Sequence, residues 1–420
     1  MRHVIYYSLW CVLSLLCFTN CNNTSKTLPK DETKIEIDND SIFYIPFVKL
    51  KDEIRIVITV RINNKVDAKL IVDNGIYSLH LSESFAQKHA RDLEMTLYPN
   101  IQSIGSFHGS ETKSYIAKGS FYFHVKDSVF KTVCNAGYGI DDEFIFEYAD
   151  IVPDNQLQYL WDNELIDGVL PLEALAKQGI VLINNEKKRI EFPKKVDSIA
   201  IPYPYKKLQD GRQIVSFPLL FEKENKKEKF IFETSLDLGS SSRLFTLFQN
   251  SKIKTIVSQL KLYTITNFIN NDAAKEMLFF NHLYAGGEYV IVKDVAFLQS
   301  PKDIIDLWLG ISFLSHYNIY FDYSKQIIYL KSIQPSFSMA DTNSILYGSL
   351  GIRKVSAEGF FLYEIMAINP NNIKINLQVG DQILRINDRD ISKCSTILSD
   401  QSDTFVTVVR NKDTLTLFKK

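Results

Sequence analysis

The chain of 420 residues is poor in cysteine, has no excess of charge of either sign and lacks a long apolar run after its first residues. Three of the five cysteines lie at or before Cys21, which leaves Cys134 and Cys394 far apart, so a disulfide framework is not expected. The formal net charge of −1 gives no basic footprint for a nucleic-acid partner. A membrane-spanning helix needs about 20 apolar residues, and we expect none after Cys21.

The N-terminus holds the one apolar run, Val4 to Phe18, which is short for a membrane span and typical of a signal peptide. Thr19-Asn20-Cys21 follows, and it resembles the box of bacterial lipoprotein signals, although Gly, Ala or Ser is usual in place of Asn20. The resemblance implies export to the cell envelope, in the periplasm or at the outer membrane, with a lipid anchor on Cys21. The alternative is plain secretion with Cys21 unmodified. We expect residues 1–21 to be the signal and the polar residues 22–41 to be a flexible tether.

Composition favours strands, because 28 Phe and 21 Tyr stand against 17 Gly and 12 Pro. Partly alternating runs such as Ile54–Val60 and Phe121–Val125 support this expectation. A connector with charges and three prolines lies at 193–204, and a second connector lies at 332–343. The expected domains are therefore 42–197, 198–333 and 344–420.

An internal repeat is the most informative feature. Leu70-Ile71-Val72-Asp73-Asn74-Gly75-Ile76-Tyr77-Ser78 aligns with Thr234-Ser235-Leu236-Asp237-Leu238-Gly239-Ser240-Ser241-Ser242, so that Asp, Gly and the last Ser coincide. A second match, Asp167 to Leu175 with Asp306 to Leu314, follows in the same order, and both copies then run into an expected hairpin. The two matches predict duplication of a whole lobe, with extra loop residues in the first copy.

An apolar strand that ends in Asp-x-Gly, a later apolar segment with Gly and a terminal hairpin resemble one lobe of a pepsin-like or retropepsin-like aspartic protease. The resemblance covers about residues 45 to 332, and two copies in one chain resemble the bilobal form. It implies a mainly β fold with two tandem aspartic-protease-like β-barrel lobes. It also implies that Asp73 and Asp237 are the catalytic dyad of an aspartic-type endopeptidase, a hydrolase that acts on a peptide or protein substrate and needs no metal or other cofactor.

Two carboxylates pressed together cannot both ionise cheaply, so they share a proton and titrate as a unit. The ionised member takes a proton from a water molecule, and the protonated member donates to the scissile carbonyl. Gly75 and Gly239 let the backbone turn tightly beside each carboxylate. A mobile hairpin usually covers such a dyad, and the segment around Gly105 and Gly109 is the expected flap.

The residue after each Asp departs from the family. Members carry Thr or Ser there, whose hydroxyl ties the two lobes together beneath the dyad, whereas this chain has Asn74 and Leu238. Asn74 can still hydrogen-bond, but the side chain of Leu238 cannot. The alternative function is therefore a non-catalytic exported protein that binds peptides or proteins on a degenerate aspartic-protease scaffold.

Other interpretations of these residues explain less. Asp73 and Asp237 could be turn residues at strand ends, but this would not explain the repeat. Ser240-Ser241-Ser242 has no Gly-x-Ser-x-Gly context for a nucleophile. The histidines show no metal-ligand spacing such as His-Glu-x-x-His, so no metal site is expected.

The C-terminal segment 344–420 resembles a PDZ domain. The run Val379-Gly380-Asp381-Gln382-Ile383-Leu384-Arg385-Ile386-Asn387 carries this resemblance most specifically. The resemblance implies that Leu350, Gly351 and Ile352 form the loop whose amides receive the C-terminal carboxylate of a peptide or protein ligand. The strand beyond this loop would then pair with the ligand.

Overall fold

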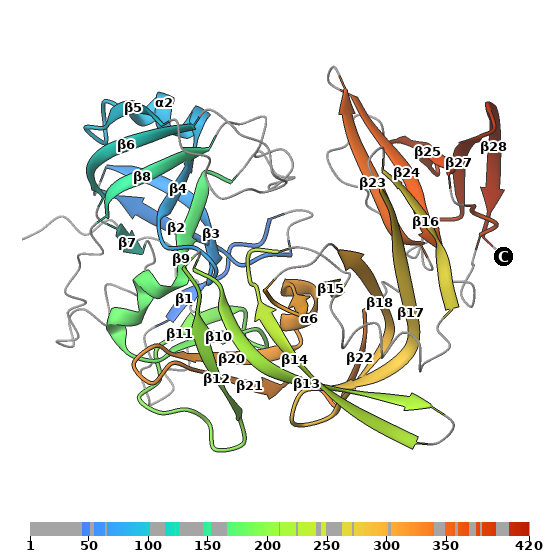
Figure 1. Cartoon of the computed structure of the whole chain (residues 1–420). Coiled ribbons are helices and arrows are strands. Elements are labelled where there is room, and N and C mark those ends of the chain that lie inside the picture. The colour runs from blue at the N-terminus through green and yellow to red at the C-terminus, as the bar shows by residue number, and fades with distance from the viewer. Residues whose placement is uncertain are drawn as a thin grey trace, which may run out of the picture. The chain divides into compact units, whose positions relative to one another are not determined.

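The computed structural model of the chain describes residues 44–50, 54–63, 65–100, 114–121, 123–125, 146–152, 166–209, 211–223, 226–240, 245–248, 263–270, 273–300, 304–339, 349–357, 360–368, 375–378, 380–391 and 403–419. Over these residues the protein is mainly β, with its strands in several sheets and only short helices (Figure 1), which confirms the expected fold class at this level. None of the helices in these segments is both long enough and apolar enough to span a membrane.

One sheet of eight strands has the order β5-β6-β8-β4-β9-β3-β2-β7. Its strands are β2 (Val57–Ile62), β3 (Val66–Asp73), β4 (Leu79–Ser82), β5 (Thr96–Asn100), β6 (Ser114–Phe121), β7 (Phe123–Val125), β8 (Phe146–Val152) and β9 (Gly168–Pro171). Helix α2 (Glu83–His89) follows β4, and its cap Ser82 accepts a hydrogen bond from the N–H of Phe85 at 3.2 Å. The 3₁₀ helix η1 (Leu172–Gln178) follows β9.

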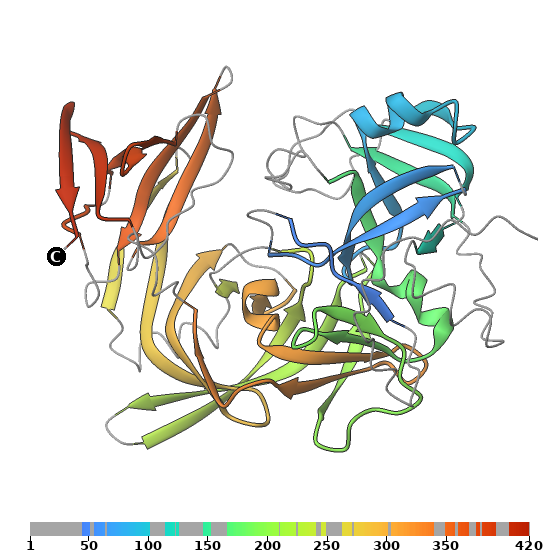
Figure 2. The ribbon, with the colours of Figure 1, turned by 180° about the vertical axis from the view of Figure 1, so that it is seen from behind.

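A second sheet has the order β1-β11-β10-β20-β21-β12-β13-β14-β19-β15-β18-β17-β16, with β22 beside β18. Its strands are β1 (Tyr44–Pro46), β10 (Val181–Asn184), β11 (Arg189–Glu191), β12 (Ile201–Lys207), β13 (Gln213–Lys223), β14 (Lys226–Leu236), β15 (Phe245–Phe248), β16 (Tyr263–Asn270), β17 (Ala273–Ala285), β18 (Val290–Ser300), β19 (Leu307–Leu309), β20 (Tyr317–Asp322), β21 (Ile327–Ser332) and β22 (Ser336–Ser338). Helix α6 (Ile311–Leu314) follows β19. Both ribbon views show the long hairpin of β13 and β14 in yellow-green (Figures 1 and 2).

The strand pairing of the body, residues 42–339, repeats once. In the first copy β2 pairs antiparallel with β3, β3 parallel with β9, β9 antiparallel with β4, and β4 parallel with β8. In the second copy β13, β14, β19, β15 and β18 pair in the same succession and with the same directions. The hairpins β10–β11 and β20–β21 follow η1 and α6 and join through the pair β10–β20. The repeat predicted from the sequence is therefore present in the strand pairing.

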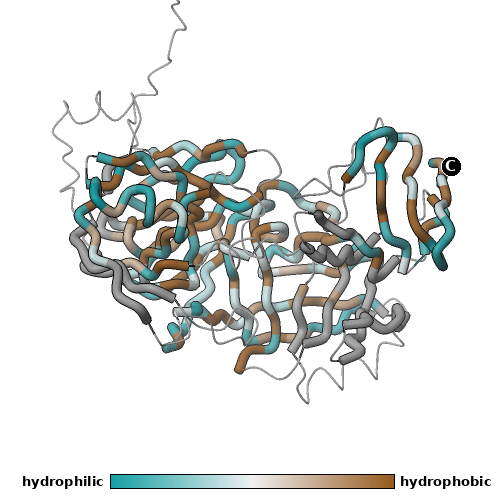
Figure 3. Tube along the Cα trace, turned by 90° about the horizontal axis from the view of Figure 1, so that it is seen from above, coloured by the Kyte–Doolittle hydropathy of each residue, from teal (hydrophilic) through white to brown (hydrophobic). Residues whose placement is uncertain are grey.

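The core of the body explains the sequence pattern of its strands. Along β12, Tyr203 and Tyr205 are buried while Pro202 and Pro204 are exposed, which is the alternation of a sheet with one solvated face. The last four residues of β3 are all buried, as expected for a strand covered on both faces. Hydrophobic and hydrophilic stretches follow one another along the chain trace in Figure 3.

The third sheet is formed by the C-terminal part of the chain, in the order β23-β24-β25-β27-β28 with β26 beside β25. Its strands are β23 (Ser349–Ala357), β24 (Phe360–Ile368), β25 (Gln382–Ile386), β26 (Arg389–Asp390), β27 (Phe405–Arg410) and β28 (Asp413–Phe418). It has its own cluster of buried side chains, which includes Ile365, Ile383 and Val406. Asp381, from the most specific motif of this segment, is buried and forms an ion pair with Arg410 at 2.7 Å.

Candidate active site

Asp73 is the last residue of β3, where the parallel neighbour β9 places Pro171 opposite it. The backbone before it is fixed from the other side, since the N–H of Val72 donates to the carbonyl of Ile56 at 2.8 Å. Only 9% of Asp73 is exposed. A carboxylate is thus held at the carboxyl end of a strand that lies between two neighbours.

Asp237 stands at the corresponding place after β14. Its N–H donates to the carbonyl of Leu309 in β19 at 2.9 Å, which continues the parallel pairing of the two strands by one residue. Its side chain is half-buried. The second copy therefore presents its Asp by the same backbone construction as the first.

Two further aspartates fix these strands in matching ways. The carboxylate of Asp167 accepts a hydrogen bond from the N–H of Lys69 at 2.8 Å, and that of Asp306 accepts one from the N–H of Glu233 at 3.0 Å. Lys69 and Glu233 each lie four residues before the Asp of the Asp-x-Gly motif. The second sequence match aligns Asp167 with Asp306, but it does not reveal that each anchors the strand leading to the site.

The structure brings the two Asp-x-Gly loops into contact. The N–H of Gly75 donates to Oδ1 of Asp73 and the N–H of Gly239 donates to Oδ1 of Asp237, each at 2.7 Å. A Cβ added to Gly239 would lie 2.2 Å from Oδ2 of Asp73. The carboxylate of the first copy therefore lies directly against the glycine of the second, and only a glycine leaves it that space.

This proximity changes how both groups titrate. Burial raises the pKa of Asp73 to about 8, and the negative charge of Asp237 is the second cause. Burial also raises the pKa of Asp237, against the lowering effect of hydrogen bonds from Gly239, Trp308 and Ser240. The two carboxylates therefore titrate as a coupled pair, and near neutral pH Asp73 holds a proton.

Asn74 connects the two copies beneath the pair. Its Nδ2 donates to the carbonyl of Leu236 at 2.8 Å, and its Oδ1 accepts from the N–H of Leu238 at 2.9 Å. Nδ2 also lies 3.4 Å from Oε1 of the buried Gln213. The expectation that Asn74 can hydrogen-bond is confirmed, and one amide side chain supplies both a donor and an acceptor across the two copies.

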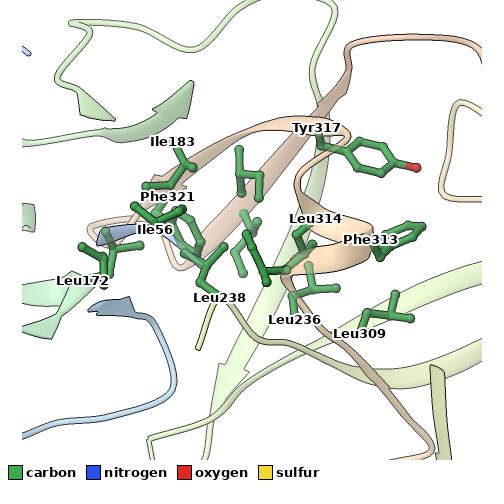
Figure 4. Close-up of a cluster of buried hydrophobic side chains, with 14 of the residues drawn as sticks. Ile56, Leu172, Ile183, Leu236, Leu238, Leu309, Phe313, Leu314, Tyr317 and Phe321 are labelled. Atoms are coloured by element: carbon green, nitrogen blue, oxygen red, sulfur yellow. The ribbon is translucent and has the colours of Figure 1, made fainter. Parts of the chain in front are cut away.

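The side chain of Leu238, by contrast, packs in the hydrophobic core. It is fully buried and belongs to the main hydrophobic cluster, together with Ile56 and Phe321 (Figure 4). Only its backbone N–H takes part in the hydrogen bonds of this region. The link between the copies is therefore one-sided, with a polar side chain from the first copy and an apolar one from the second.

Two neighbours of the pair were not found from the sequence. Nε1 of Trp308 donates to Oδ2 of Asp237 at 2.9 Å. Arg55 is buried, and its positive charge lowers the pKa values of Asp73 and Asp237. Trp308 lies inside the second sequence match, but nothing in the pattern shows where its indole points. Arg55 has no sequence signal, because its approach to the pair depends on tertiary packing.

The remaining predicted residues have different outcomes. The expected flap residues Gly105 and Gly109 and the expected lipid attachment site Cys21 lie outside the described residues. Leu350, Gly351 and Ile352 were expected in a loop, but the structure has them in β23. The register of β23 against β24 shifts between Ser349 and Gly351 and again before Ile352, so strand pairing with local irregularities replaces the loop.

Within the described residues, no group of three or more His, Cys, Asp and Glu side chains could hold a metal ion.

No family model and no curated protein matches this chain. Solved structures that it resembles include conglutin gamma, a basic 7S globulin from lupine seeds, with a TM-score of 0.40 and 8% identity over 69% of this chain and 95% of that one. Another is the basic 7S globulin from soybean, with a TM-score of 0.42 and 9% identity over 70% of this chain and 95% of that one. Similarity at this level carries no argument about function, which depends on the geometry of the site.

Proposed function

We propose that the chain is an aspartic-type peptidase that hydrolyses peptide bonds through Asp73 and Asp237. The observation that carries the proposal is the contact between the two Asp-x-Gly loops, in which the charge of one carboxylate raises the pKa of the other. Duplicated strands, duplicated glycine amides and a matching pair of anchoring aspartates support the same function. Two aspartates that served only as exposed surface residues would not require these duplicated contacts.

The chemistry follows from a pair that holds one proton. Ionised Asp237 accepts a proton from a water molecule, whose oxygen attacks the carbonyl carbon of the peptide bond, while protonated Asp73 donates to the carbonyl oxygen. The proton on Asp237 then passes to the leaving nitrogen as the C–N bond breaks, and Asp73 takes a proton back from a hydroxyl of the tetrahedral intermediate, so the pair returns to its starting state. General acid–base steps of this kind contribute about 10²–10⁴-fold each.

The test is cleavage of a mixed peptide library by the wild type and by Asp237→Asn, with Asp92→Asn as the matched control. The side chain of Asp92 is 60% exposed and lies just after α2, so its loss removes a carboxylate without touching the site. We expect cleavage by the wild type and the control and a loss of at least about 100-fold in Asp237→Asn. Equal cleavage by all three proteins would refute the assignment.

The proposed scaffold is a pair of aspartic-protease-like lobes, 42–197 and 198–333, followed by a PDZ domain at 344–420. The repeated strand pairing supports the two lobes, and the separate sheet and hydrophobic cluster of the C-terminal segment support the third domain. For the PDZ domain we propose that β23 pairs with the C-terminus of a peptide or protein. A library of peptides with free C-termini should bind the full chain, and the same peptides amidated at the C-terminus should not.

We further propose that the protein is exported and held on a membrane of the cell envelope by a lipid on Cys21. The apolar run Val4 to Phe18 and the residues around Cys21 support this proposal. Cys21→Ala should move the protein from the membrane fraction to the soluble fraction and remove the mass of the acyl chains. An unmodified Cys21 in the wild-type protein would rule out the anchor.

The second candidate function is peptide binding without cleavage, and the apolar Leu238 favours it. Because the side chain of Leu238 is apolar and buried, it supplies no hydrogen bond to the link beneath the pair. The positive charge of Arg55 stabilises the ionised form of both carboxylates and so opposes the binding of the shared proton. The discriminating experiment measures peptide binding and peptide cleavage on the same preparation. Binding that survives in Asp237→Asn, with no cleavage by the wild type, would establish this alternative.

A further inference from the structure

We propose that Trp308 is a positioning residue that makes Asp237 the ionised member of the pair and leaves Asp73 to carry the proton. The inference rests on the proposed peptidase function, because it assigns the base and the acid of that reaction. Trp308 donates a hydrogen bond to the carboxylate of Asp237, so the role that we assign to it acts through that carboxylate.

The hydrogen bonds around the two carboxylates are unequal. Oδ1 of Asp237 accepts from the N–H groups of Gly239 at 2.7 Å and Ser240 at 3.1 Å, and its Oδ2 accepts from Trp308 at 2.9 Å. At Asp73 the one bond of this kind that the described contacts give comes from Gly75, at 2.7 Å. N–H groups only donate, so each one stabilises a carboxylate over the neutral acid. Asp237 is therefore the better anion.

Packing holds the indole of Trp308 in a position from which it can donate to Asp237. Its ring packs with Ile214, Ile305 and Leu208 in a small apolar cluster, and its strand β19 pairs with both β14 and β15. Trp308 is half-buried, and its Nε1 donates to the carboxylate of Asp237. Because packing fixes the ring, the indole N–H loses little conformational entropy when it donates to the carboxylate. This suits a residue that positions a catalytic group.

Two other charged or titratable groups lie near the pair. Arg55 lowers the pKa of both carboxylates. Burial first, and the nearby Asp73 in part, raise the pKa of Tyr323 well above its usual range, so this phenol stays neutral. The charge of Asp237 contributes to the raised pKa of Asp73, which is the order of ionisation that the donors predict.

The direct test is a pH titration of the Trp308 indole N–H by NMR on protein labelled with ¹⁵N-tryptophan. The chain has three tryptophans, and Trp308→Phe identifies the resonance of Trp308 while it keeps an aromatic ring in the cluster. We expect this resonance to shift in the acidic step of the pair, at a lower pH than the step near pH 8 that belongs to Asp73. We expect the shift to disappear in Asp237→Asn and to persist in Asp73→Asn.

A main titration of the resonance near pH 8 would mean that Asp237 carries the proton, and this would overturn the inference. A resonance that does not titrate, or that titrates unchanged in Asp237→Asn, would overturn it as well. The measurement needs no substrate, so it decides the role of Trp308 even if the wild type cleaves no peptide. Failure of the proposed function and failure of this inference are therefore separate results.

Kinetics give a second readout. In Trp308→Phe the acidic limb of the kcat profile should move up by about one to two pH units, because the lost bond stabilised only the anion. At a pH on this acidic limb kcat should fall by about tenfold or more, while KM stays within about twofold. Tyr77→Phe is the control, since it removes a hydroxyl that donates to the carbonyl of Leu208 and leaves both carboxylates untouched. An acidic limb that stays in place in Trp308→Phe contradicts the proposal.

Discussion

Gly239 shows how little space separates the carboxylate of Asp73 from the loop of the second copy. Gly239→Ala would bring a Cβ to 2.2 Å from Oδ2 of Asp73, so the carboxylate must move. A displacement of about 1 Å can cost about 100-fold in rate, and we expect a loss of this size in cleavage. Gly75→Ala is the control, because its added Cβ would lie 3.3 Å from Oδ1 of Asp73, and we expect it to cost less than about tenfold. Similar rates for the two variants would contradict this prediction.

The hydrogen bonds of Asn74 lead to a prediction about the stability of the fold. Asn74→Ala removes two buried hydrogen bonds and leaves the carbonyl of Leu236 and the N–H of Leu238 without them. We expect the free energy of unfolding in urea to fall by about 2–4 kcal/mol. Gln87→Ala, which removes an exposed amide on α2, should change it by less than about 0.5 kcal/mol. Equal effects of the two substitutions would show that Asn74 does not brace the copies.

The raised pKa of Asp73 fixes the sign of a pH dependence. In the unfolded chain the pKa of an aspartate is about 3.9, so between about pH 4 and pH 8 the folded protein holds a proton that the unfolded protein has lost. This group therefore stabilises the fold at low pH, and its contribution is lost as pH rises towards 8, on the order of 1 kcal/mol per pH unit. Urea unfolding between pH 5 and pH 8 should show this slope in the wild type and a weaker one in Asp73→Asn. Parallel curves would contradict the assignment.

At the scale of elements, Asp167 and Asp306 each accept a backbone hydrogen bond from the strand that ends at the site. Asp306→Ala would leave the N–H of Glu233 without its acceptor, and we expect about 1.5–3 kcal/mol of destabilisation. Asp167→Ala should cost a similar amount through Lys69, because the two contacts are equivalent. Chemical denaturation of the two variants checks this, and a large effect in only one would show that the copies no longer share this anchor.

The elements also show where sequence reasoning succeeds. The repeat predicted the duplicated strand pairing, because two ordered matches constrain a whole pairing pattern. The expectation that Asp73 and Asp237 lie together came from the resemblance to aspartic proteases. It did not predict the contact from Trp308 or the charge of Arg55, since side-chain direction depends on packing between strands distant in sequence. The loop expected at Leu350 is strand instead, because a single motif does not fix where strand pairing begins.

At the scale of the molecule, the body and the C-terminal sheet have separate hydrophobic clusters. Within the body, the pair β10–β20 joins strands of both copies, so we expect the copies to unfold together. Deletion of residues 344–420 should leave the body folded, with its calorimetric transition shifted by less than about 4 °C. The same truncated protein should keep its activity on short peptides. A truncated chain that has no cooperative transition would refute this independence.

The one-sided contact between Asn74 and Leu238 has a consequence for the history of such a chain. Identical halves would place the same residue on both sides of this contact, either two amides or two leucines. Here the amide of one half reaches backbone groups of the other, while the leucine opposite it fills the core. The two copies have therefore diverged at this pair of positions, and each now supplies a part that the other lacks.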